Sequence, residues 1–101
     1  MMTVSIQSVH FDADQKLLNY IESKVQSLSR LLKGHKIHAR IVLRLEKVSR
    51  IQDKIVEIIV DLPKKTCIAK SVNKSFEKAL AEAMGSLKMQ ARKHMDKLQN
   101  E

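Results

Sequence analysis

The sequence of 101 residues is poor in several residue types that mark common protein classes. It has one cysteine, one proline, two glycines and no tryptophan. Because Cys67 has no partner within the chain, it cannot form an internal disulfide, which fits a reducing compartment such as the cytoplasm. We therefore expect a cytoplasmic protein in which Cys67 is a small buried hydrophobic residue.

Aromatic residues and long apolar runs are also scarce. The three aromatics are Phe11, Tyr20 and Phe76, whereas modules that read single-stranded RNA need several exposed rings for stacking. No apolar run approaches the roughly 18 residues of a membrane span, and the chain does not begin with a signal peptide. We expect neither that mode of RNA recognition nor a membrane partner.

The residue patterns of enzymes and metal sites are missing as well. There is no glycine-rich phosphate loop, no nucleophile with a matching histidine and acid, and no carboxylate pair in an apolar setting. The four histidines have no cysteine or carboxylate at ligand spacing. We expect no enzyme, no cofactor, no metal and no small-molecule substrate.

What the chain does have is positive charge. Lys and Arg number 19 against 11 Asp and Glu, a formal net charge of +8. Such an excess in a small domain indicates a polyanionic partner, nucleic acid first. The hydrophobic content of 44% supports a packed core, and the length predicts one domain over residues 1–101.

The segment 73–98 carries the clearest pattern, two opposite stripes at about 100° per residue. The apolar stripe consists of Phe76, Leu80, Ala83, Leu87, Ala91, His94 and Leu98. The opposite stripe is cationic and consists of Lys74, Lys78, Lys88 and Arg92. We predict a helix with one buried face, in which His94 is a packed residue, and one face that presents positive charge.

Gly85 lies in the middle of the cationic stripe. A glycine inside a helix costs about 1 kcal/mol relative to alanine. Either a nucleic-acid backbone approaches closely there, or the sequence simply tolerates the residue. On the sequence alone we favour tolerance.

The remaining patterns predict one further helix and four strands. Helix-start residues (Asp12 with Gln15, supported by Asp14) precede an apolar period that continues to the Lys33–Gly34 stop. Alternating or apolar runs predict strands over 3–9, 37–46, 54–62 and 66–71. The connections are a basic loop over 47–53 that carries Arg50 and a turn over 63–65, and Ser71 or Asn73 is expected to cap the last helix.

This order, β-α-β-β-β-α, predicts an α+β fold with a four-stranded sheet and two helices packed on one face. Three consecutive strands favour an antiparallel meander. A ferredoxin-like fold would need a strand after the last helix. The arrangement resembles a double-stranded-RNA-binding domain with an added N-terminal strand.

With the elements in this order, the sequence resembles the ribosome hibernation-promoting factor family, which includes the ribosome-associated inhibitor. The resemblance lies in residues 8–32 (SVHFDADQKLLNYIESKVQSLSRLL), 36–47 (KIHARIVLRLEK) and 76–98 (FEKALAEAMGSLKMQARKHMDKL). It departs from the family pattern at Glu77, Met89 and Met95. Because the sequence ends at Glu101, it looks like the short form, without the additional C-terminal domain of the long form.

The resemblance implies a factor that binds the small ribosomal subunit in the decoding channel, where messenger and transfer RNA would sit, and silences translation during stress or stationary phase. It implies that Lys24, Arg30, Lys93 and Lys97 contact RNA. With the cationic stripe, the expected RNA-binding residues are Lys24, Arg30, Lys74, Lys78, Lys88, Arg92, Lys93 and Lys97. We expect a monomer away from the ribosome.

Two other functions are compatible with the sequence. The outer sheet face, with Val42, Ile55 and Ile59 beside Arg40 and Arg44, could dock an acidic protein. Alternatively, the chain could be a general double-stranded-RNA-binding domain, since A-form RNA is recognised largely by its backbone and groove geometry.

Overall fold

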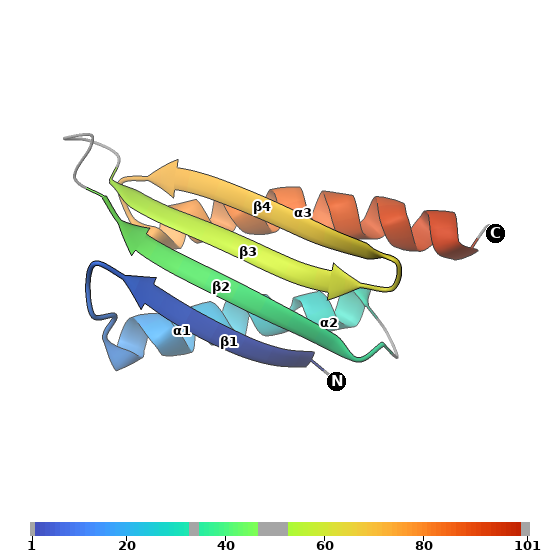
Figure 1. The fold of residues 1–101 in the computed structure, drawn as a ribbon, viewed down its shortest axis with the longest axis horizontal. Helices are drawn as coiled ribbons and strands as arrows, with labels where there is room; N and C mark the ends of the chain where they lie inside the picture. Colours follow the sequence, from blue (N-terminus) through green and yellow to red (C-terminus); the bar gives the residue numbers. More distant parts are fainter. Residues whose placement is uncertain (1, 33–34, 47–52, 100–101) are drawn as a thin grey trace.

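A computed structural model describes residues 2–32, 35–46 and 53–99 and contains one four-stranded sheet with helices on one face (Figure 1). The elements in chain order are β1 Met2–Val9, α1 Gln15–Gln26, α2 Leu28–Leu31, β2 Ile37–Leu45, β3 Lys54–Leu62, β4 Lys65–Asn73 and α3 Phe76–Gln99. This confirms the α+β class and the predicted order. The predicted helix stop at Lys33–Gly34 and the predicted loop residue Arg50 lie outside the described residues.

The sheet has the spatial order β1-β2-β3-β4. Strands β2, β3 and β4 pair antiparallel, with Ile41 opposite Ile58 and Ile58 opposite Ala69, so the predicted meander is confirmed. Strand β1 pairs parallel to β2, with Ile6 opposite Ile41. Parallel neighbours need a long crossover, and α1 with α2 supplies it. In Figure 1, α1 and α2 lie behind β1 and β2, and α3 lies behind β3 and β4.

The core lies between the sheet and the helices. Alternate residues of β2 and β3 face the helices, and most of them are buried. They form one core with Ile21 and Val25 of α1, Leu28 of α2 and most of the apolar stripe of α3. The largest fully buried side chains include Ile41, Leu43, Ile58, Leu80 and Leu87. Phe11 and Phe76 stack with ring centroids 4.9 Å apart, which joins the start of α3 to the β1–α1 connection. Burial of one such aliphatic or aromatic side chain stabilises a fold by about 1.5–3 kcal/mol.

The first predicted helix is divided at Ser27. The Ser27 hydroxyl donates to the Lys24 carbonyl at 2.6 Å, and the Ser27 N–H also bonds back to Lys24. A serine that bonds locally in this way competes with the regular helical ladder, which explains the break between α1 and α2. The predicted cap is also displaced, because Asp14 rather than Asp12 accepts the Leu17 N–H, at 2.8 Å.

The boundary between β4 and α3 differs from the prediction too. Val72 and Asn73 pair with β3, so the strand runs two residues further than expected and neither Ser71 nor Asn73 caps the helix. Instead, the Ser75 hydroxyl accepts the Lys78 N–H at 3.1 Å. Helix α3 therefore begins at Phe76, and the placement of Lys74 on its cationic stripe was wrong.

The inward face of β4, which the sequence left open, carries Cys67 and Ala69. The Cys67 side chain is 1% exposed, so the prediction of a small buried residue is confirmed. Burial raises the pKa of the Cys67 thiol, and the nearby Lys65 ammonium opposes that shift. A thiol of this kind stays protonated and unreactive near neutral pH.

The Asp14 cap can be tested by removing its carboxylate. We expect Asp14→Ala to lower the free energy of unfolding by about 1 kcal/mol, because the Leu17 N–H loses its acceptor. Urea denaturation followed by circular dichroism measures the change. Asp12→Ala is the matched control, since the described residues give its exposed side chain no hydrogen bond, and an equal loss in the two variants would contradict the assignment.

Substitution of Gly85 tests whether the fold requires a glycine at this position of α3. A Cβ built on Gly85 has nothing within 4 Å, so packing within the described residues does not require a glycine. We expect Gly85→Ala to raise the free energy of unfolding by about 0.5–1 kcal/mol, the difference in helix propensity. A lower stability in the same urea titration would show that the site is crowded or strained.

Candidate nucleic-acid interface

A row of polar side chains fixes the rotation of α3 against the sheet edge. Glu82 accepts hydrogen bonds from Ser71 and Asn73 of β4. The Gln90 amide donates to the Ile68 carbonyl at 3.1 Å. These positions are spaced by eight residues and lie on one side of the helix, so this side is held toward β4.

His94 continues the same row and holds the β3–β4 turn. It is half-buried, and its Nε2 lies 2.7 Å from the Pro63 carbonyl, which confirms the prediction that it is a packed residue. Because the carbonyl can only accept, Nε2 is the donor in this bond. The contact brings Lys64 and Lys65, at the turn and the start of β4, beside the C-terminal part of α3.

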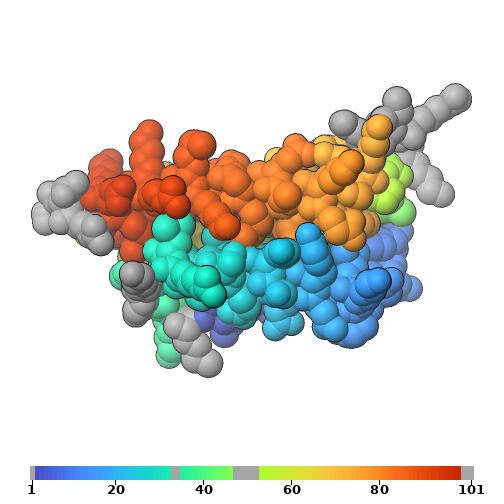
Figure 2. Space-filling view, turned by 180° about the vertical axis from the view of Figure 1, so that it is seen from behind, coloured from blue at the N-terminus to red at the C-terminus, as the bar shows by residue number. Residues whose placement is uncertain are grey.

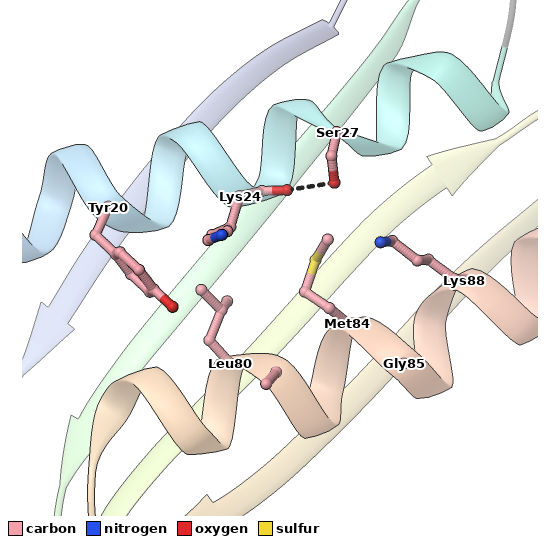
Figure 3. Close-up of a pocket in the computed structure, with 8 residues that line it drawn as sticks. Tyr20, Lys24, Ser27, Leu80, Met84, Gly85 and Lys88 are labelled. Carbon is pink, nitrogen blue, oxygen red and sulfur yellow. Dashed lines mark hydrogen bonds between the residues drawn. The ribbon is translucent and has the colours of Figure 1, made fainter.

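With one side of α3 held to β4, Lys88 and Arg92 face away from that side, and Lys88 lines a hollow together with residues of α1. Figure 2 shows this helical face, with α3 running alongside α1 and α2. Three hollows lined by described residues lie on or beside it. We call the first the α1–α3 groove; it has a volume of about 320 Å³, and its lining includes Tyr20, Lys24, Leu80, Met84, Gly85 and Lys88. Figure 3 shows the Tyr20 ring directed toward Leu80 and the Lys88 side chain reaching from α3 toward α1, with Met84 between Lys24 and Lys88.

The other two hollows continue along α3. The second has a volume of about 470 Å³ and shares Gly85 and Lys88 with the groove, adding Met89, Arg92, Lys93 and Asp96. The third, of about 390 Å³, shares Lys93 with the second and joins α3 to the β3–β4 turn. We call the basic residues that line the three hollows the cationic band: Lys24, Lys64, Lys65, Lys88, Arg92, Lys93 and Lys97.

The charges of the cationic band are not neutralised within the described part of the chain. There, ion pairs join Arg44 to Glu46 at 3.5 Å and Lys54 to Asp53 at 2.8 Å, and neither involves the band. One acidic residue, Asp96, lines the second hollow. A surface of unpaired ammonium and guanidinium groups with a single acid favours an anionic ligand.

The structure brings together five of the eight predicted site residues, namely Lys24, Lys88, Arg92, Lys93 and Lys97. The other three, Arg30, Lys74 and Lys78, are exposed but line none of these hollows. Arg30 is on α2, Lys78 is in the first turn of α3, and Lys74 precedes that helix.

Tyr20, Lys64 and Lys65 were not among the predicted site residues, although they line the hollows. The Lys24 ammonium lies 5.6 Å from the centroid of the Tyr20 ring, a cation–π contact. Its signal in the sequence is the i, i+4 spacing of the two residues on one helix. The two lysines come close to α3 through the turn, which no local pattern indicates.

The opposite, open face of the sheet is more apolar than its predicted residues suggested. Val42 and Ile59 are half-buried and Ile55 is 9% exposed, whereas Ile68 and Val72 of β4 are 53% and 40% exposed. Arg40 lies on the same face, opposite Ile59. Ile68 and Val72 are therefore the side chains that a protein partner would meet first on this face.

Residues 2–32, 35–46 and 53–99 contain no group of three or more His, Cys, Asp or Glu side chains placed to hold a metal ion. Of the helices described, none is both long and apolar enough to cross a membrane.

Solved structures provide a comparison of the fold. The N-terminal domain of Protein Y from Thermus thermophilus superposes with a TM-score of 0.77 at 21% identity, covering 90% of this chain and 97% of that one. A ribosomal subunit interface protein from Coxiella burnetii gives a TM-score of 0.69 at 22% identity, covering 95% of this chain and 99% of that one. At these identities the likeness establishes a shared fold.

No curated protein sequence matches the chain. A family model does: the one described as sigma 54 modulation protein / S30EA ribosomal protein matches residues 4–99. This match spans all the strands and helices but the first residues of β1, and it confirms the resemblance found in the sequence. The chain belongs to the sigma 54 modulation protein / S30EA ribosomal protein family, the family of the ribosome hibernation-promoting factors.

Proposed function

We propose that this protein is a ribosome hibernation factor that binds the small ribosomal subunit in the decoding channel and silences translation during stress or stationary phase. In this proposal residues 1–101 act as one ribosome-binding domain in the cytoplasm, monomeric when free, that binds RNA and catalyses no reaction. Ribosomal RNA is the partner that the cationic band contacts.

The observation that carries the proposal is the continuity of the cationic band in a member of a ribosome-associated family. Its hollows share Lys88 and Lys93 as common walls, so adjacent phosphates of one RNA could be neutralised without a gap. Each neutralised phosphate releases condensed counterions, which supplies affinity without reading bases. Arg30, Lys74 and Lys78 would extend the contact beyond the band at either end.

The decoding channel follows from the family resemblance and is compatible with the shape of the molecule. Helix α3 has 24 residues, so its length is about 36 Å at 1.5 Å per residue. Such a helix can lie along a folded RNA surface and contact several phosphates while the sheet behind it keeps its backbone fixed. Occupying the path of messenger and transfer RNA would stop initiation without any chemical step.

Charge reversal within the band tests the RNA-binding site. We expect Lys88→Glu with Arg92→Glu and Lys93→Glu to weaken co-sedimentation with purified small subunits strongly at moderate salt, while leaving measurable binding at low salt. Since each lost phosphate contact contributes about 0.7–0.9 to the slope of log affinity against log salt, the slope should fall by about 2–3. Quantitative sedimentation over a series of salt concentrations measures both quantities.

The matched control reverses the same number of charges away from the helical face. Lys36, Arg40 and Lys70 are exposed, and their triple substitution by glutamate gives the same net charge as the band variant. We expect this control to keep most of the affinity. If both triple variants bind equally well, the band is not the site. In that case Ile68→Asp with Val72→Asp tests the open sheet face. Loss of binding in this double variant would support the alternative function, a module that docks a protein on that face.

A displacement experiment tests the proposed place of binding. Small subunits are loaded with a labelled messenger and initiator transfer RNA, and the protein is added at increasing concentration. We expect release of both RNAs at the concentrations that give binding, because the ligands would occupy one channel. Binding without release would overturn the decoding-channel proposal. Equal competition by an arbitrary RNA duplex would instead support a general double-stranded-RNA-binding domain.

A further inference from the structure

We propose that the α1–α3 groove is a site for a single unpaired nucleotide of a structured RNA, with its base against Tyr20 and its phosphate between Lys24 and Lys88. The inference rests on the proposed function and adds to it a ligand class and a subsite. It assigns to Tyr20 a base contact, whereas the cationic band contacts phosphates.

The groove combines an apolar floor with a polar rim. Leu80 and Met84 of α3 form the floor and are 1% and 6% exposed, and the Tyr20 ring forms a wall of α1 with 38% of its surface exposed (Figure 3). A volume of about 320 Å³ lies at the lower end of the range of small-ligand sites. The groove is therefore large enough for one base and too small for a folded peptide element.

Lys24 and Lys88 provide the positive charge that would bind the phosphate of a nucleotide in the groove. The Lys24 ammonium contacts the Tyr20 ring, 5.6 Å from its centroid, and Figure 3 shows Lys88 reaching in from α3 on the other side. Lys24 and Lys88 line the groove, and no acidic residue is among the described residues that do. An aromatic surface beside two ammonium groups complements both parts of a nucleotide, because every base stacks through its π-face and the phosphate binds the cations.

Gly85 supplies a second, independent observation. It lines both the groove and the neighbouring hollow, and nothing lies within 4 Å of the position that a Cβ would take. The glycine lowers helix stability, and packing within the described residues gives no reason for it. Its effect is an open approach to the α3 backbone, which lets a ligand pass between Tyr20 and Lys88.

The small number of aromatic residues agrees with this limited role. A module that reads a stretch of single-stranded RNA needs a ring for each of several bases, and this chain has one exposed ring, Tyr20, among its described residues. One ring suffices for one base. The groove would therefore favour an RNA that is mostly paired and carries a bulged or flipped-out nucleotide.

The experiment uses a synthetic RNA hairpin with one bulged 2-aminopurine in its stem and a matched hairpin that is fully paired. We expect the protein to bind the bulged hairpin more tightly and to quench its fluorescence through stacking on Tyr20. Tyr20→Ala should weaken binding to the bulged hairpin by about 5- to 150-fold, the range for loss of one base–aromatic stack. Binding to the paired hairpin should not change.

Three further variants separate stacking from a change of structure. Tyr20→Phe keeps the ring and should keep both the preference and the quenching. Gly85→Met should fill the groove and remove the preference, whereas Ser86→Met adds the same side chain at an exposed position that lines none of the hollows described and should preserve it. Equal affinity for the two hairpins in the unaltered protein, or a preference that survives Tyr20→Ala, would overturn the inference.

The outcomes distinguish this inference from the proposed function. If Tyr20 selects the bulged hairpin but the protein does not bind small subunits, the nucleotide site stands and the proposed function fails. If the protein binds small subunits through the cationic band but shows no preference for the bulged hairpin, the function stands and the nucleotide site is wrong.

Discussion

Burial of two apolar helix stripes on the same side of one small sheet is the constraint on which the other features depend. The inward residues of β2 and β3 are fully buried, as are Ile21 and Val25 of α1 and Leu80 and Leu87 of α3. Because both helices must cover that single apolar surface, they lie next to each other and their outward faces form one surface. Positive charges from separate parts of the chain meet there without any direct bond between them.

Side-chain hydrogen bonds between α3 and the edge of the sheet then determine which residues lie on that surface. Packing alone would allow α3 some rotation about its axis, and the hydrogen bonds of Glu82, Gln90 and His94 to β4 and the β3–β4 turn remove it. The acid Glu82 is thereby used within the fold, in hydrogen bonds to Ser71 and Asn73 of β4. Glu82, Gln90 and His94 received little weight in the sequence analysis, yet their hydrogen bonds determine which charged side chains of α3 lie together.

The elements of this fold were predictable because their periodicities are strong, and the errors have local physical causes. Strand β3 was predicted with its observed bounds. Ser71 and Asn73 have side chains typical of helix caps, yet pairing with β3 kept them in the strand, and Ser75 took that role. The break at Ser27 follows from one hydroxyl bond within an otherwise regular apolar period. The parallel pairing of β1 depends on contacts distant in sequence, which hydrophobic patterns do not encode.

The candidate site was predictable where it lies on the helices, with Lys24 on α1 and the other correctly predicted residues on α3. The spacing along α3 indicated a common surface for Lys88 and Arg92, and the family resemblance added Lys93 and Lys97. Lys64 and Lys65 come near them only through the turn held by His94. Arg30, Lys74 and Lys78 satisfied the same charge argument and line no hollow of the band. Charge patterns along a chain predict the sign of the charge on a surface. Which residues come together on that surface depends on tertiary packing.

Because the cationic band lies on a folded backbone, the entropy cost of binding RNA is reduced. A basic tail that orders on contact loses backbone freedom at the moment of binding, which offsets part of its electrostatic gain. Here the backbone of α3 is ordered before any partner arrives, so that loss is confined to the long basic side chains. An RNA already folded to complement this helix would bind with little additional entropic cost, whereas one that must rearrange would carry nearly all of that cost itself.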